Sequence, residues 1–168
     1  MSDLVIYFSR SGENYFGGEL KNIEKGNTEV IAEYIHEITG ADLFKVEPAV
    51  EYPEDYMKCI DVAKKEQQKD ARPEIKETLT DISSYDTIFI GFPNWWGTLP
   101  MPMFTQLEQL DFEGKTVKPF VTHEGSGFGT SKKDLKKLCA GAEIKKGLSI
   151  PGVEVGNAKA NVEAWINE

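Results

Sequence analysis

The chain has 168 residues, of which 40% are hydrophobic and 28% are charged, and this composition indicates a folded domain rather than a disordered segment. Its 28 acidic and 19 basic residues give a net charge of −9, which argues against nucleic-acid binding because phosphate recognition needs a clustered basic surface. No apolar run approaches the roughly 18 residues of a membrane span, and no signal-peptide pattern is present, so we expect a cytoplasmic, monomeric protein without membrane binding.

Strand and helix patterns alternate from the start of the chain. Residues 4–8 form a continuous apolar run of strand length, which is typical of a central parallel strand covered on both faces. Apolar residues then recur at helical spacing from Val30 to Ile38, and Gly40 ends that helix. Residues 41–46 predict a second, more polar strand, which we place at an edge of the sheet.

The rest of the chain repeats this alternation. Further helices are predicted over residues 54–68, from Met103 to Leu110, and over residues 131–139 and 158–166, and further strands over residues 87–92, 115–122 and 142–150. Five strand–helix units with short connections predict a doubly wound, five-stranded parallel sheet with helices on both faces. No internal repeat or second domain is indicated, so we expect a single domain over residues 1–168.

Ligands of such folds bind outside the carboxyl ends of the strands, at the point where the strand order reverses. Three loops would meet there, and they cover residues 9–28, 93–101 and 122–130. These loops are also the most unusual segments of the chain. The coincidence predicts a ligand site between them.

The first loop has the residues of an anion site at both ends: Ser9, Arg10, Ser11 and Gly12 at its start, and Gly26, Asn27 and Thr28 where a helix begins. Hydroxyl groups and free backbone N–H groups at a helix N-terminus bind anions. We interpret residues 13–26 as an insertion, because removing them leaves a compact phosphate loop. Asn14 and Asn27 compete for one position in that loop, and a simple helix cap at Asn27 or Thr28 is the alternative.

The second and third loops suit a flat ligand. Trp95 and Trp96 directly follow a buried strand in a segment stiffened by glycine and proline, which favours a platform for a flat ligand over packing against a helix. The third loop, residues 122–129, is glycine-rich and offers backbone N–H groups and hydroxyls. Cys59, Cys139 and His36 have no metal-binding spacing, so we expect buried thiols and no metal site.

Together these three loops resemble those of a flavodoxin, from the branch with an inserted phosphate loop and a tryptophan pair. The resemblance covers essentially the whole chain. It rests on Ser9, Ser11, Gly12, Asn27 and Thr28, on Pro93, Trp95, Trp96 and Gly97, and on the glycine-rich third loop. It implies the strand order 2-1-3-4-5 and an FMN cofactor at the carboxyl ends of the strands.

The resemblance also implies which residues contact FMN: Ser9, Arg10, Ser11, Asn14, Asn27 and Thr28 in the first loop, Pro93, Asn94, Trp95, Trp96 and Gly97 in the second, and Thr122, His123, Glu124, Gly125, Ser126 and Gly129 in the third. The first group would hold the phosphate, although flavodoxins typically bind this dianion with neutral donors, so Arg10 has the weakest claim. Trp96 would stack on the isoalloxazine ring, with Trp95 packed inward, and the third loop would approach the other ring edge.

Other nucleotide-binding and catalytic motifs are missing. The strand ends lack the acidic residues of a phosphorelay receiver, and the chain has no dinucleotide fingerprint and no GxSxG elbow. It also has no GxxxxGK[ST] phosphate loop, because Gln109 stands where the first glycine before Gly114-Lys115-Thr116 belongs. No residue stands out as a hydride- or proton-transfer group, and we assign none as catalytic. We therefore expect a low-potential electron carrier that serves redox partner proteins or a small-molecule acceptor. An NAD(P)H-dependent reductase of quinones and a scaffold without flavin are the alternatives.

Overall fold

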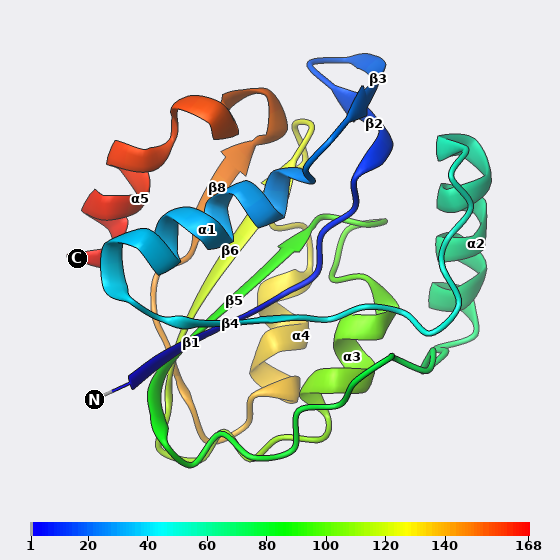
Figure 1. Ribbon diagram of the computed structural model, residues 1–168. Helices are drawn as coiled ribbons and strands as arrows, with labels where there is room; N and C mark the ends of the chain where they lie inside the picture. The colour runs from blue at the N-terminus through cyan, green and yellow to red at the C-terminus, as the bar shows by residue number, and fades with distance from the viewer. Residues whose placement is uncertain (1) are drawn as a thin grey trace.

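A parallel sheet forms the centre of the computed structural model, which describes residues 2–168 (Figure 1). The main strand order is β4-β1-β5-β6-β7, and β8 pairs with β6 further along its length. The bounds are Ser2–Tyr7 for β1, Asp42–Lys45 for β4, Tyr85–Pro93 for β5, Thr116–His123 for β6, Glu143–Ile144 for β7 and Leu148–Pro151 for β8. This is the order 2-1-3-4-5 in the numbering of the predicted strands, so the predicted fold is confirmed.

Helices cover both faces of this sheet (Figure 1). Their bounds are Asn27–Thr39 for α1, Tyr56–Gln68 for α2, Met101–Leu107 for α3, Ser131–Leu138 for α4 and Lys159–Ile166 for α5, with a 3-10 turn, η1, over Gly152–Asn157. The helices α1 and α5 lie on one face, and α3 and α4 lie on the other. Within residues 2–168, no helix has both the length and the apolar character needed to cross a membrane.

The two faces of β1 contribute to separate hydrophobic cores. Leu4 and Ile6 pack in the core that contains residues of α3 and α4, whereas Val5 and Tyr7 pack in the core that contains residues of α1 and α5. All four side chains are buried. The apolar run that predicted a strand covered on both faces therefore has the expected physical cause, because side chains alternate across a strand.

The sequence predicts one continuous fifth strand over residues 142–150. This prediction is wrong, because the structure has two separate strands here, β7 and β8. Val117 O accepts a hydrogen bond from Lys145 N at 2.8 Å, so Pro119, two residues further on, faces the same neighbouring segment. Proline has no N–H group to donate to that neighbour. Gly147 also lies so close that an added Cβ would collide with the Phe128 ring. The ladder is therefore interrupted here and resumes at Leu148.

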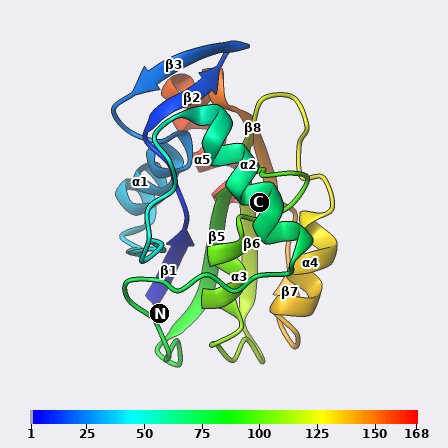
Figure 2. The same cartoon turned by 90° about the vertical axis from the view of Figure 1, so that its right-hand side faces the viewer.

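The predicted insertion folds as a β-hairpin above the carboxyl ends of the strands (Figures 1 and 2). Its strands are β2, Gly12–Phe16, and β3, Glu19–Ile23, which pair antiparallel. Gly17 and Gly18 connect them with φ values of +68° and +85°. Two residues with positive φ suit the short turn that matches the twist of a hairpin. Figure 2 shows the hairpin and α2 at the same end of the molecule.

Both cysteines are free and buried, as the sequence predicts. Burial in apolar surroundings raises the pKa of the Cys139 thiol to about 12 and also raises the pKa of Cys59. Because the thiolate is the reactive form, both side chains are unreactive in the folded protein at neutral pH.

Candidate functional site

The three loops converge on a cavity of about 260 Å³ at the carboxyl ends of β1, β5 and β6. Twelve of the residues predicted to contact a ligand line it: Ser9, Arg10, Asn14, Asn27, Thr28, Pro93, Asn94, Trp95, Thr122, His123, Glu124 and Ser126. Tyr15, Ile23 and Tyr56 complete the lining. The topology thus brings together the segments that the sequence singled out.

The N-terminus of α1 forms one end of this cavity. Its N-cap residue is Gly26, which makes no side-chain cap, and Ser9 Oγ instead accepts a hydrogen bond from Glu29 N at 3.0 Å. A Cβ on Gly26 would collide with Ser9 Oγ and lie 2.8 Å from Arg10 O, so only glycine allows this close approach. The first N–H groups of a helix have no partner within the helix, and those of Asn27 and Thr28 therefore suit an anion.

A pair of threonine hydroxyls lies next to this end. Thr28 Oγ1 and Thr122 Oγ1 are 2.8 Å apart, and the two residues are 1% and 3% exposed. One hydroxyl donates its proton to the other, so a single O–H of the pair remains to donate elsewhere. Since both residues line the cavity, this O–H is a further donor for a ligand.

Asn94 connects the second loop to the third. Its Nδ2 donates to Ser126 Oγ at 3.0 Å and to Gly127 O at 2.7 Å, and its backbone N donates to Thr122 O at 2.9 Å. Its Oδ1 is buried and has no hydrogen-bond partner within residues 2–168. A buried acceptor without a donor costs about 1–3 kcal/mol. Asn94 lines the cavity, and a hydrogen-bond donor of a ligand near this residue would satisfy its Oδ1.

The two tryptophans have different surroundings. Trp95 packs inward, with its ring 5.0 Å from those of both Phe8 and Tyr52 in edge-on contact. Trp96 is 47% exposed and lies against α2, where its Nε1 donates to Ile60 O at 2.9 Å. It lines an adjoining cavity of about 200 Å³, which α2 shares with the second loop. The aromatic surface of the second loop thus spans both cavities.

His123 in the third loop is held in one tautomer. Its Nδ1 accepts a hydrogen bond from Gly125 N at 2.8 Å, so Nε2 carries the proton and donates to Ser149 Oγ at 2.9 Å. Desolvation lowers the pKa of His123, and the nearby carboxylates of Glu124 and Glu154 oppose this shift. The imidazole is therefore neutral at pH 7.

Five predicted residues lie outside this cavity. Ser11 is exposed and lines a neighbouring cavity on the other side of the first loop, and Trp96 lines the cavity beside α2. Gly97, Gly125 and Gly129 shape the loop backbones instead. Thr130 N donates to Gly97 O at 2.6 Å, and an added Cβ on Gly129 would collide with that oxygen. The absence of a side chain at Gly129 therefore lets the second and third loops approach closely.

The sequence analysis did not name the three further lining residues as ligand contacts, although Tyr15 and Ile23 fall within the predicted first loop. Tyr15 and Ile23 belong to the hairpin, and Tyr56 begins α2. The apolar character of Tyr15 within a polar insertion was the available signal. Tyr56 was recognised only as part of a helix face, because its contact with the cavity depends on tertiary packing.

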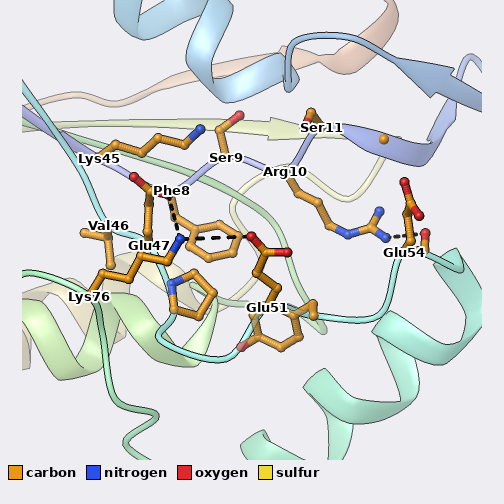
Figure 3. Close-up of a pocket in the computed structure, with 13 residues that line it drawn as sticks. Phe8, Ser9, Arg10, Ser11, Lys45, Val46, Glu47, Glu51, Glu54 and Lys76 are labelled. Atoms are coloured by element: carbon orange, nitrogen blue, oxygen red, sulfur yellow. Dashed lines mark hydrogen bonds and ion pairs between the residues drawn. The ribbon is translucent and has the colours of Figure 1, made fainter.

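The neighbouring cavity is larger, at about 470 Å³, and Figure 3 shows the side chains that line it. Lysine and glutamate side chains dominate it, and Lys76 lies 3.7 Å from Glu47 and 4.0 Å from Glu51. No residue of the second or third loop lines it. The smaller cavity is the better candidate site, because residues of all three predicted loops and the N-terminus of α1 line it.

A helix N-terminus, an asparagine and aromatic residues line one cavity, and these groups suit a phosphorylated aromatic ligand. A family model described as flavodoxin matches residues 3–168, and the chain belongs to this family. The resemblance inferred from the three loops is thereby confirmed.

Solved structures of flavoproteins share the whole fold. A candidate flavoprotein from Bacteroides eggerthii DSM 20697 is 30% identical, over 99% of this chain and 96% of that chain, with a TM-score of 0.77. One from Bacteroides uniformis ATCC 8492 is 28% identical, over 99% and 98%, with a TM-score of 0.76. A flavoprotein in complex with FMN from Lactobacillus acidophilus NCFM is 26% identical, over 93% and 97%, with a TM-score of 0.67. Comparison with curated proteins gives no match.

Proposed function

We propose that the cavity between the three loops binds FMN and that the protein is a low-potential electron-transfer flavoprotein. One observation carries this proposal: Asn94, whose buried Oδ1 has no partner within residues 2–168, and the N-terminus of α1 line the same cavity. A ligand that satisfies both needs an anionic group at one end and a hydrogen-bond donor on a flat polar ring at the other. FMN has both features.

The donors at the α1 end fit a phosphate dianion. The N–H groups of Asn27 and Thr28, the remaining hydroxyl proton of the threonine pair and the hydroxyl of Ser9 would donate to its oxygens. Each hydrogen bond to a charged oxygen contributes about 1.5–3 kcal/mol. Several such bonds anchor a phosphate without a lysine, and no lysine lines this cavity.

The second and third loops fit the flavin ring. Asn94 Oδ1 would accept from an N–H or O–H group of the cofactor, and the aromatic surface of Trp95 and Trp96 would contact the ring. The FMN complex of the Lactobacillus acidophilus relative, which is 26% identical, supports this assignment. The flavin supplies the redox chemistry, and the protein binds it, orients it and limits its contact with water.

The side chains around the cavity favour electron transfer over catalysis on a substrate. His123 is neutral and both its ring nitrogens are hydrogen-bonded, and the Arg10 guanidinium is occupied by four oxygens of the protein. Neither is free to move a proton to or from a substrate. The net charge of −9 disfavours added negative charge on a bound cofactor and suits docking to basic redox partners.

The cavity beside α2 favours a second candidate function. Tyr56, Cys59, Ile60 and Ala63 form its α2 side, and it adjoins the FMN cavity at Asn94 and Trp95. An apolar space next to a flavin could admit a nicotinamide or a quinone, so an NAD(P)H-dependent reductase is the alternative.

The experiment that tests the function is an anaerobic visible spectrum of the FMN-loaded protein before and after excess NADPH, repeated with NADH. A flavin band that persists with both supports a carrier that needs a separate reductase. Rapid bleaching supports the reductase. Failure to retain FMN during gel filtration, together with no quenching of flavin fluorescence, refutes both.

A further inference from the structure

The guanidinium group of Arg10 lies between the base of the hairpin and the segment that precedes α2 (Figure 3). Its Nη1 donates to Glu13 O and to Asn14 Oδ1, the latter at 3.2 Å. Its Nη2 donates to Pro53 O at 2.9 Å and to Glu54 O at 2.8 Å. The planar fork of arginine thus binds two oxygens of each segment, and most of its donors are used within the protein.

Further contacts join the same two segments. Glu13 Oε1 accepts a hydrogen bond from Tyr56 N in the first turn of α2 at 2.8 Å, and Asn14 Nδ2 donates to Arg10 O at 2.8 Å. The rings of Tyr15 and Tyr56 meet edge-on with centroids 4.8 Å apart. The hairpin and α2 are therefore linked by side chains although they lie about 40 residues apart in sequence.

These linked segments form the outer wall of both cavities beside the tryptophan loop. Tyr15 and Ile23 from the hairpin and Tyr56 from α2 line the proposed FMN cavity across from residues of the second and third loops. Arg10 lines this cavity and the one beside α2, so its position determines how the wall is placed relative to Trp95. The backbone of Arg10 meanwhile belongs to the phosphate loop.

We propose that Arg10 is a positioning residue, which holds the hairpin and α2 together as the wall against which the flavin ring lies, and that it is not a ligand of the phosphate. This inference rests on the proposed function, because it assumes that the ring enters between the wall and the second loop. Its consequence is specific. Loss of Arg10 displaces a wall that FMN and riboflavin both contact, so both ligands lose affinity by the same factor.

The test is a fluorescence titration of FMN and riboflavin against wild type, Arg10→Met, Arg10→Lys and Ser9→Ala. We expect Arg10→Met to weaken both flavins about tenfold, because the wall that both ligands contact is displaced, and to leave the ratio of their affinities unchanged. Arg10→Lys keeps the charge but not the fork, and it should also leave the ratio unchanged. Ser9→Ala is the matched control at the phosphate end, because it removes a hydroxyl proposed to contact the phosphate, and it should weaken FMN more than riboflavin.

Loss of FMN affinity alone in Arg10→Met would overturn the proposal and assign Arg10 to the phosphate. Unchanged affinity for both flavins would overturn it too, as would full recovery of FMN binding by Arg10→Lys without recovery of riboflavin binding.

Amide hydrogen exchange of the flavin-free protein provides a second readout that needs no cofactor. In Arg10→Met, or in Arg10→Lys if the first variant does not fold, we expect faster exchange in β2 and at Tyr56 N, with β1, β5 and β6 unchanged. If the wild type binds no flavin, the proposed function fails, but this exchange pattern still shows whether Arg10 joins the hairpin to α2. Unchanged exchange in both segments would refute the link.

Discussion

Replacement of Asn94 by alanine should weaken flavin binding and leave the stability of the flavin-free protein nearly unchanged. The change removes two hydrogen bonds from Asn94 Nδ2, to Ser126 Oγ and Gly127 O, and these contribute about 2 kcal/mol together. It also removes the buried Oδ1 that has no partner within residues 2–168, which costs the flavin-free protein about 1–3 kcal/mol. The two effects oppose each other, so we expect the free energy of unfolding of the flavin-free protein to change by less than about 1 kcal/mol.

Flavin affinity should respond differently. In the proposed binding mode a flavin would donate a hydrogen bond to Oδ1, and the variant would lose this bond together with the link between the second and third loops. A loss of about 1.4 kcal/mol of binding free energy corresponds to a tenfold larger dissociation constant. Because the contact is remote from the phosphate end, FMN and riboflavin should weaken by the same factor.

Urea unfolding of the flavin-free protein and fluorescence titration of both flavins measure the two quantities. Ser126→Ala is the matched control, because it removes one acceptor of Nδ2 and leaves Oδ1 in place. It should cost about 0.5–1.5 kcal/mol of stability and weaken flavin binding less than Asn94→Ala does. The reasoning is refuted if the free energy of unfolding of Asn94→Ala is lower than that of wild type by more than about 3 kcal/mol and the variant binds flavin with wild-type affinity.

Three other changes test separate parts of the structure. Gly26→Ala should weaken FMN binding at least tenfold more than riboflavin binding in paired titrations, because the new methyl group displaces the phosphate loop; equal losses would contradict this. The folded pKa of His123 lies below its ordinary value of 6.5, so the unfolded chain binds this proton more readily. The stabilisation that His123 contributes is therefore complete above about pH 6.5 and is lost as the pH falls toward the folded pKa. Protonation of Nδ1 then breaks the hydrogen bond that this nitrogen accepts from Gly125 N. Urea midpoints measured from pH 8 to pH 5 should show this loss in wild type and less of it in His123→Gln, and parallel curves would exclude His123 as its source. Thr28→Val keeps the shape of a buried side chain but leaves the Thr122 hydroxyl without its partner, and it should cost about 1–3 kcal/mol in urea unfolding. An unchanged midpoint would show that the hydroxyl pair contributes nothing.

Much of the fold could be predicted because periodicity is a local property of the sequence. The apolar run at residues 4–8 and the helical spacing from Val30 to Ile38 predict β1 and α1 without knowledge of their neighbours. The strand order came from the resemblance rather than from the pattern. The continuous fifth strand was wrong because its break depends on Pro119 in the neighbouring strand, which lies about 25 residues away in sequence.

The sequence by itself determined which loops meet and which residue types they contribute. Glycine, hydroxyl and tryptophan residues follow three parallel strands, and the carboxyl ends of such strands must share one edge of the sheet. Only the tertiary structure decided which side chains face the cavity. Ser9 lines it and Ser11 does not, and Tyr56 joins it from a distant helix. The direction of a loop side chain is set by contacts with distant segments, such as those that hold the Arg10 guanidinium between the hairpin and α2. The local sequence does not predict such contacts.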